Sequence, residues 1–310
     1  MPVVHAGLRL ILAALACTAA LSSAYAQEPQ QRRSVIERYD SAQAFEDGVF
    51  AHYDLTERVA DYDTCYDYNT GAQTWIALYH PKRLGPGSFD EFITASNWNE
   101  FNAEVGRLAL QGWYVDDMDA AGHTPSSVAT HVAILNPAEG GQVLINESDW
   151  ARFESNRATR NAEGLRLVDI DVALVRGTQR FYGVMRPGTQ EERVVRENTW
   201  DAFDQRRQLL SGQGWRLKDF GVSATGVVGV FNRGAGPHSF MRFANWHDFQ
   251  ERTVQIDGTM VLTDIECWLE GTNTRYAGVW SAPPRQRRPR PIDNATPAGR
   301  PTIRETGPGQ

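Results

Sequence analysis

Five aspartates recur at one position of a repeated pattern and are the most regular polar feature of the sequence. They are Asp61, Asp117, Asp169, Asp219 and Asp264. Carboxylates collected from five copies of one unit could bind a cation or a cationic ligand. Alternatively, each could accept hydrogen bonds from backbone N–H groups or an arginine, which every copy needs in order to fold. The periodicity favours the second interpretation, because active sites rarely recur five times.

Cys65 and Cys267 follow the first and the last of these aspartates by four and three residues, so they occupy nearly equivalent places in two copies. In an exported chain such a pair can form a disulfide. That bond needs Cα atoms about 5.5 Å apart, so it would require the first and last copies to meet. The alternative is that both are small core residues that never meet.

Known catalytic motifs are absent from the sequence. A serine–lysine nucleophile needs a serine three residues before a lysine, but Tyr79 precedes Lys82 at that distance and Trp215 precedes Lys218. There is no Gly-x-Ser-x-Gly, His-Glu-x-x-His, phosphate-binding Gly-Lys or Cys-x-x-Cys motif. The histidines beyond the N-terminal stretch fall at unrelated places: His52, His80, His123, His131, His238 and His247. The sequence therefore predicts no catalytic residue, no metal site and no cofactor.

The repeated unit is recognised by an aromatic pair that would start a helix. A tryptophan, or an alanine in the first copy, is followed three residues later by phenylalanine, and the pairs begin at Ala42, Trp98, Trp150, Trp200 and Trp246. Each pair follows a residue suited to cap a helix N-terminus, namely Ser41, Asn97, Asp149, Thr199 and Asn245. Five such residues in register predict five helix starts.

Strands are expected on both sides of each helix. The aspartate lies 19 residues after the anchor in four copies and 18 in the fifth, which fits a helix, a turn and a strand without insertions. Gly112, Gly164 and Gly214 suit the left-handed turn that ends a helix. A later strand has a small residue at one place, which predicts close approach of a helix or a neighbouring unit: Ala77, Ala133, Gly183, Gly229 and Gly278.

The predicted fold is α+β, with five tandem strand–helix–strand–strand repeats in residues 34–282. Their approximate bounds are 34–81, 89–137, 142–187, 192–233 and 239–282. The units should stack on one another, because none can bury its apolar faces alone. A propeller-like closed ring is favoured over an open curved array.

These repeats resemble a bacterial tandem-repeat domain family. The third copy reads GLRLVDI from Gly164 and RFYGVM from Arg180, and the fifth reads LTDI from Leu262 and RYAGVW from Arg275. Similar repeats form the amino-terminal half of fungal polyglycine hydrolases. The resemblance implies an exported binding or accessory module, whose larger relatives carry a separate serine-hydrolase half that is missing here. Ala42 and Thr56 in the first copy depart from the pattern, which has Trp and Gly there.

Both ends of the chain differ from the repeats. Residues 1–26 are predicted to be a signal peptide, with an apolar run from Leu10 to Leu21 and small residues at Ala24 and Ala26. Residues 27–33 would be a linker. Residues 283–310 are rich in proline and arginine, and we expect a disordered tail.

The charge balance excludes nucleic acid as a partner. The chain has 31 lysines and arginines and 38 acidic residues. Without Arg9 and the tail, which holds six arginines and two acids, 24 basic residues face 36 acidic ones. A net charge of −12 repels phosphate backbones.

The sequence thus favours a periplasmic or secreted, non-enzymatic repeat module that binds a protein, peptide or glycan. No transmembrane segment is expected after signal removal. The variable loops after the repeated aspartates are the expected binding face. The alternatives are a hydrolase-like enzyme with an unrecognised site at the ring centre, and a structural spacer.

Overall fold

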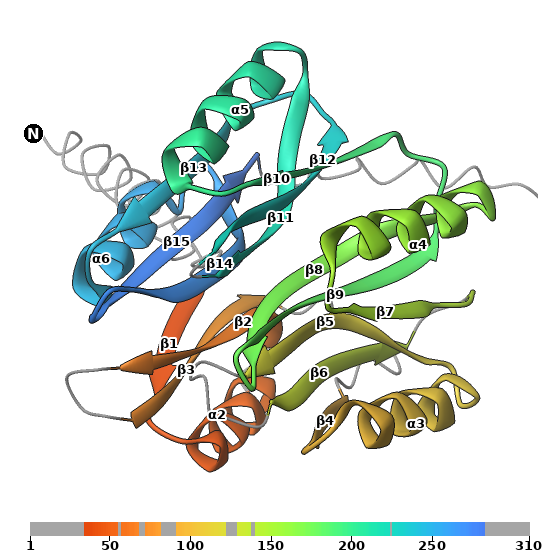
Figure 1. Cartoon of the computed structure of the whole chain (residues 1–310). Coiled ribbons are helices and arrows are strands. Elements are labelled where there is room, and N and C mark those ends of the chain that lie inside the picture. Colours follow the sequence, from red (N-terminus) through yellow and green to blue (C-terminus); the bar gives the residue numbers. More distant parts are fainter. Residues whose placement is uncertain are drawn as a thin grey trace, which may run out of the picture.

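The computed structural model describes residues 34–54, 57–67, 72–81, 91–121, 129–137, 140–223 and 225–282. The predicted signal peptide, linker and tail lie outside these residues. The α+β class and the five repeated units are confirmed, since each unit contributes one helix and three antiparallel strands (Figure 1).

The elements of the units follow in chain order. Unit 1 comprises β1 (Val35–Tyr39), α2 (Ala42–Asp54), β2 (Glu57–Asp67) and β3 (Ala72–Pro81). Unit 2 comprises β4 (Glu91–Ala95), α3 (Trp98–Ala109), β5 (Trp113–Ala121) and β6 (Thr130–Pro137). Unit 3 comprises β7 (Val143–Glu147), α4 (Trp150–Ala162), β8 (Leu165–Val175) and β9 (Thr178–Pro187). Unit 4 comprises β10 (Glu192–Glu197), α5 (Trp200–Gly212), β11 (Trp215–Ser223) and β12 (Gly226–Arg233). Unit 5 comprises β13 (His238–Phe243), α6 (Trp246–Ile256), β14 (Val261–Glu270) and β15 (Asn273–Ser281).

In each sheet the last strand of the unit is central. It pairs on one side with the strand before the helix and on the other with its hairpin partner, giving the orders β1-β3-β2, β4-β6-β5, β7-β9-β8, β10-β12-β11 and β13-β15-β14. The five sheets are separate, and the strands described form no closed sheet. One edge of each sheet is therefore the strand that carries the repeated aspartate.

The helices begin where the sequence predicts. The side chains of all five predicted cap residues accept a backbone N–H in the first turn, as Ser41 does from Ala44 at 3.1 Å. Gly112, Gly164 and Gly214 follow three of the helices with φ between 83° and 87°, the left-handed conformation expected there.

The phenylalanine of each helix anchor is the centre of its unit's core. Phe45, Phe101, Phe153, Phe203 and Phe249 are 0% exposed. The predicted close approach at the small strand residue is confirmed, because a Cβ on Gly229 would lie 2.6 Å from the Phe203 ring. The anchor tryptophans Trp98, Trp150, Trp200 and Trp246 are half-buried and pack against the cores of their units. They lie at the border of the core, where Trp200 stacks between other aromatic rings.

Contacts between units run through the aspartate-bearing strands. β2 contacts β5, β5 contacts β8, β8 contacts β11, and β11 contacts β14. β14 in turn contacts β2, so the fifth unit also touches the first. The helices lie on the outside of this set of strands (Figure 1).

Candidate functional site

A β-bulge precedes each repeated aspartate. The hairpin register shifts between Val59 and Asp61, and the same shift occurs before the other four aspartates. A bulge adds one residue to its strand and turns the following side chains to a new direction. Here all five aspartates line one small cavity between the strands, and the structure thereby brings the predicted residues together.

Four further carboxylates line the same cavity. Asp63, Asp119, Asp171 and Glu266 stand two residues after the repeated aspartates of units 1, 2, 3 and 5. Unit 4 has Gly221 at this place, whose Cβ would lie 3.2 Å from the Asp171 backbone. We call the nine acidic side chains the carboxylate cluster. Eight of them are at most 9% exposed, and Asp117 is half-buried.

The repeated aspartates link successive units through the backbone. Asp117 accepts the N–H of Tyr62 in unit 1 at 3.0 Å, and Asp219 accepts that of Ile170 in unit 3 at 3.0 Å. Asp264 likewise accepts the N–H of Phe220. The donor is in each case the residue after the aspartate of the preceding unit. These aspartates have a structural role, because they satisfy buried N–H groups that the sheets leave unpaired.

The same link joins the last unit to the first. The Ile265 N–H donates to Asp61, and the Cys267 N–H donates to Asp63. One of the four further carboxylates makes a similar link: Asp171 in unit 3 accepts the N–H of Ala120 in unit 2 at 2.9 Å.

Asp169 differs from the other repeated aspartates. It is buried, but its Oδ2 has no hydrogen-bond partner in the described part of the chain. The expectation that this side chain is bonded to backbone or arginine is not met at that atom. One oxygen of Asp119 is unpartnered as well. Both residues line the cavity of the cluster.

Burial shifts the acidity of the whole cluster. It raises the pKa of Asp117 and Asp171 to about 7 and that of Asp219 to about 6. The pKa values of the other six carboxyl groups are raised well above their ordinary range, by burial first and by the charge of neighbouring carboxylates as a further cause. Loss of a proton is therefore unfavourable throughout the cluster.

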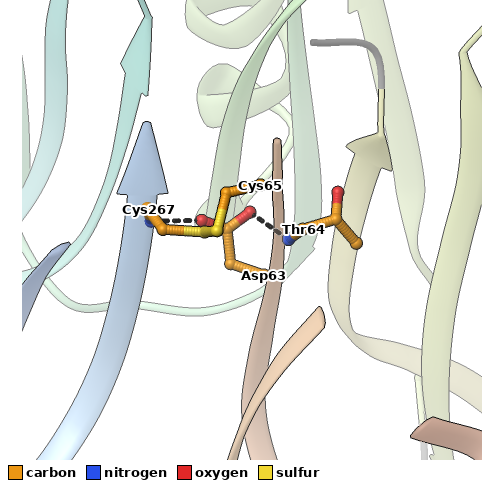
Figure 2. The surroundings of a disulfide bond; sticks show 4 residues. All are labelled: Asp63, Thr64, Cys65 and Cys267. Carbon is orange, nitrogen blue, oxygen red and sulfur yellow. Dashed lines mark hydrogen bonds between the residues drawn. A yellow bond between two sulfur atoms is a disulfide. The ribbon is translucent and has the colours of Figure 1, made fainter. Parts of the chain in front are cut away.

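Cys65 and Cys267 form a disulfide beside the cluster, with Cα atoms 5.6 Å apart. Figure 2 shows the Asp63 carboxylate between the two backbones, where it accepts the N–H groups of Cys267 and Thr64. A covalent bond and a carboxylate thus join the same two strands, β2 and β14. The two cysteines are 202 residues apart in sequence.

A groove of about 880 Å³ lies at the junction of units 5 and 1. Its walls are β1 and the first turn of α6, with Val35, Ile36, Glu37, Arg38, Asn245, Trp246, His247 and Gln250. At the two preceding junctions the matching arginine covers the matching tryptophan: Arg196 lies 5.9 Å from the Trp150 ring and Arg242 lies 5.5 Å from the Trp200 ring. At the junction of units 5 and 1 the equivalent pair is Arg38 and Trp246, and both residues line the groove.

A polar network behind the groove distinguishes unit 1. His52 contacts Glu57 at 2.5 Å and Glu37 at 3.2 Å through its two ring nitrogens. Tyr39 donates to Glu37 at 2.7 Å and shares a hydrogen bond with Tyr79. The place of His52 is taken in units 2, 4 and 5 by Leu108, Leu210 and Ile256, which are buried. Glu37, which lines the groove, is therefore held in position by side chains that only the first unit has.

Sequence reasoning did not predict that four additional carboxylates would join the repeated aspartates in one cavity, and it did not predict the groove. The two-residue spacing from the repeated aspartates is visible in the sequence and could have revealed Asp63, Asp119, Asp171 and Glu266, because residues i and i+2 share one face of a strand. The groove had no such signal. It joins segments more than 200 residues apart, and only packing brings them together.

Neither a protein-family model nor a curated protein matches this sequence. Membership of the tandem-repeat family thus stays a prediction. Across the described residues, no three histidine, cysteine, aspartate or glutamate side chains are already arranged to hold a metal ion. No helix in those residues is both long and apolar enough to cross a membrane.

Proposed function

We propose that the chain is an exported, non-enzymatic binding module whose five units close into a propeller-like ring, and that it binds a glycan in the groove between β1 and α6. Proteins and peptides are the other ligand classes expected from the sequence. The observation that carries the proposal is the open groove between units 5 and 1, because an arginine lies over the matching tryptophan at the two preceding junctions.

Closure is supported by three kinds of contact between units 5 and 1. β14 contacts β2, Cys267 is bonded to Cys65, and Asp61 and Asp63 accept backbone N–H groups from β14. The Asp61 link repeats the pattern found at the junctions of units 1 and 2, 3 and 4, and 4 and 5. An open array would leave its terminal units without such contacts.

The groove's chemistry favours a polyhydroxylated ligand. Trp246 is half-buried, so its indole offers an apolar face for a sugar ring while its other contacts hold it in place. Asn245, Gln250 and Arg38 are exposed and supply amide and guanidinium groups that can donate to hydroxyls. Glu37, fixed by His52 and Tyr39, supplies an acceptor.

An enzyme with its site at the ring centre is less well supported. The cavity at the carboxylate cluster has a volume of about 10 Å³, which is about the size of one water molecule and too small for an organic substrate. A structural spacer would not need the groove between β1 and α6.

Export and family membership are part of the same proposal. The signal-like residues 1–26 support export to the periplasm or the outside of the cell. A disulfide that joins the first and last units suits an oxidising compartment. The tandem-repeat resemblance implies an accessory role of this kind.

The test is a glycan array and a peptide array probed with the purified mature protein. We expect glycan ligands, and we expect Arg38→Ala and Gln250→Ala each to weaken binding about tenfold, which corresponds to about 1.4 kcal/mol. Asn102→Ala is the matched control, because Asn102 is exposed and occupies the same place on α3 that Gln250 occupies on α6. The control should bind normally.

Peptide binding without glycan binding would show that the ligand is a peptide, and the groove would remain the proposed binding site. Binding that both groove variants leave unchanged would rule the groove out. Absence of binding on both arrays would favour the structural spacer.

A further inference from the structure

No basic side chain that the structure describes bonds to the carboxylate cluster, although the charge of Lys218 lowers the pKa of Asp219 and Asp264 through space. No lysine, arginine or histidine in the described ranges forms a hydrogen bond or an ion pair with any of its nine acidic side chains. Carboxylates buried without a counter-charge are strongly unfavourable, so a positive charge must enter the cluster or protons must stay on it.

Two oxygens in the cluster point to a ligand. Oδ2 of Asp169 and Oδ2 of Asp119 are buried without a hydrogen-bond partner, although the equivalent atoms of Asp117 and Asp219 accept a backbone N–H. Asp169 is 6% exposed and Asp119 is 4% exposed. Both side chains line the cavity, so acceptors without a donor lie beside a space of about 10 Å³. That space is enough for one monatomic ion or one water molecule.

We infer that the carboxylate cluster is a binding site for one dehydrated divalent cation of the calcium class, with Asp119 and Asp169 as ligands. The donors are all carboxylate oxygens, which hard cations prefer. Calcium tolerates irregular geometry with six to eight oxygens at roughly 2.3–2.6 Å, whereas magnesium usually keeps several waters. The cavity has no room for a hydrated ion.

Binding requires small movements within the cluster. Several carboxyl groups contact one another in pairs, among them Asp61 with Asp117 and Asp169 with Asp219. A cation between them would draw the oxygens toward itself and replace carboxyl–carboxyl contacts by ion–oxygen bonds. The site therefore differs from the sequence expectation of no metal, which rested on scattered histidines and on acidic runs at Asp61–Asp63 and Asp116–Asp119 that lack the spacing of a known calcium loop.

The experiment uses the full mature chain, stripped with EDTA and dialysed at pH 8 against calcium, magnesium or sodium chloride. Calorimetry and equilibrium dialysis should give one bound Ca²⁺ per chain, and 1 mM Ca²⁺ should raise the melting temperature by about 5 °C, with a smaller shift from Mg²⁺ and none from equal ionic strength of Na⁺.

Asp169→Asn is the decisive variant, because it keeps the shape of the side chain and removes charge at an oxygen that accepts no hydrogen bond. We expect its calcium affinity to fall at least tenfold. Asp119→Asn is the second variant, should the first fail to fold. Asp116→Asn is the control: Asp116 adjoins Asp117 in sequence but pairs with Arg186 and Asn136 outside the cluster.

Calcium binding that survives in both cluster variants would locate the ion elsewhere and overturn the inference. Absence of bound calcium and of any melting shift at 1 mM would also overturn it, and would leave protons or a water molecule as the occupants of the cluster. These readouts are independent of the groove, so failure of the glycan proposal would not affect them.

Discussion

Asp264 in unit 5 accepts the backbone N–H of Phe220 in unit 4 at 3.0 Å, and both residues are buried. The carboxylate thus occupies the position that a strand's carbonyl would have in a continuous sheet. This contact explains how separate three-stranded sheets can adjoin along their aspartate-bearing edges without leaving buried N–H groups unsatisfied.

The first prediction concerns this contact. Asp264→Ala should lower the free energy of unfolding by about 1–3 kcal/mol, because the Phe220 N–H would lose its acceptor while remaining buried. Asp264→Asn keeps an oxygen at the same place and should cost less. Urea unfolding of both variants measures the difference. Equal stability of the alanine variant and the unmodified protein would show that the N–H finds another acceptor.

The second prediction concerns the disulfide. Replacing both Cys65 and Cys267 by alanine should lower the free energy of unfolding by about 2–5 kcal/mol, since the bond closes a loop of about 200 residues in the unfolded chain. Reductant should destabilise the unmodified protein but not the double variant. Mass mapping under non-reducing conditions should recover the peptides that contain the two cysteines as one linked species. Two free thiols in protein exported to an oxidising compartment would contradict this.

A third prediction follows from the raised pKa values of the cluster. A carboxyl group whose pKa is higher in the folded than in the unfolded chain binds protons more tightly when folded, so its stabilising effect is lost as the pH rises through the folded pKa. With pKa values of about 6 to 7 for Asp219, Asp117 and Asp171, against about 4 in the unfolded chain, the melting temperature in EDTA should fall as the pH is raised from 6.5 to 8 and then level off.

The range above pH 6.5 isolates this effect from His131. Burial lowers the pKa of His131 to about 4. The contribution of His131 to the stability of the fold is therefore constant above its unfolded pKa near 6.5 and is lost only as the pH falls below that value. Asp116→Asn, outside the cluster, should reduce this decline only slightly, because the charge of Asp116 is a lesser cause of the raised pKa of Asp117. A melting temperature that stays constant from pH 6.5 to 8 in EDTA would contradict the raised pKa values of these carboxyl groups.

The fourth prediction tests the packing of the glycine in the central strand. Gly229→Ala should destabilise by about 1–3 kcal/mol, because the new methyl group would lie 2.6 Å from the Phe203 ring and 2.7 Å from Leu217. Gly212→Ala is the contrasting control. It lies in α5 with no atom within 4 Å of a new Cβ, so it should be neutral or stabilise by about 0.5–1 kcal/mol. Thermal unfolding of the two variants should move in opposite directions, and a neutral Gly229→Ala would show that the helix can shift away from the sheet.

The sequence by itself determined the local elements of this protein. Helix starts at Asn97, Asp149 and Thr199, the left-handed glycines after the helices and the small residue opposite each helix phenylalanine all follow from interactions within about fifty residues. Such interactions depend on backbone conformation and near neighbours, which repeat whenever the residues repeat. Five copies in register made each assignment stronger than one copy could.

Tertiary structure alone decided what happens where units meet. The bulges that turn the aspartates toward one cavity, the unpartnered oxygen of Asp169 and the open groove beside Trp246 depend on the orientation of neighbouring units, which short-range preferences do not encode. Asp169 and Asp219 are equivalent in sequence, yet only Asp219 receives a backbone N–H at its Oδ2, because that contact depends on the distance between two separately folded sheets.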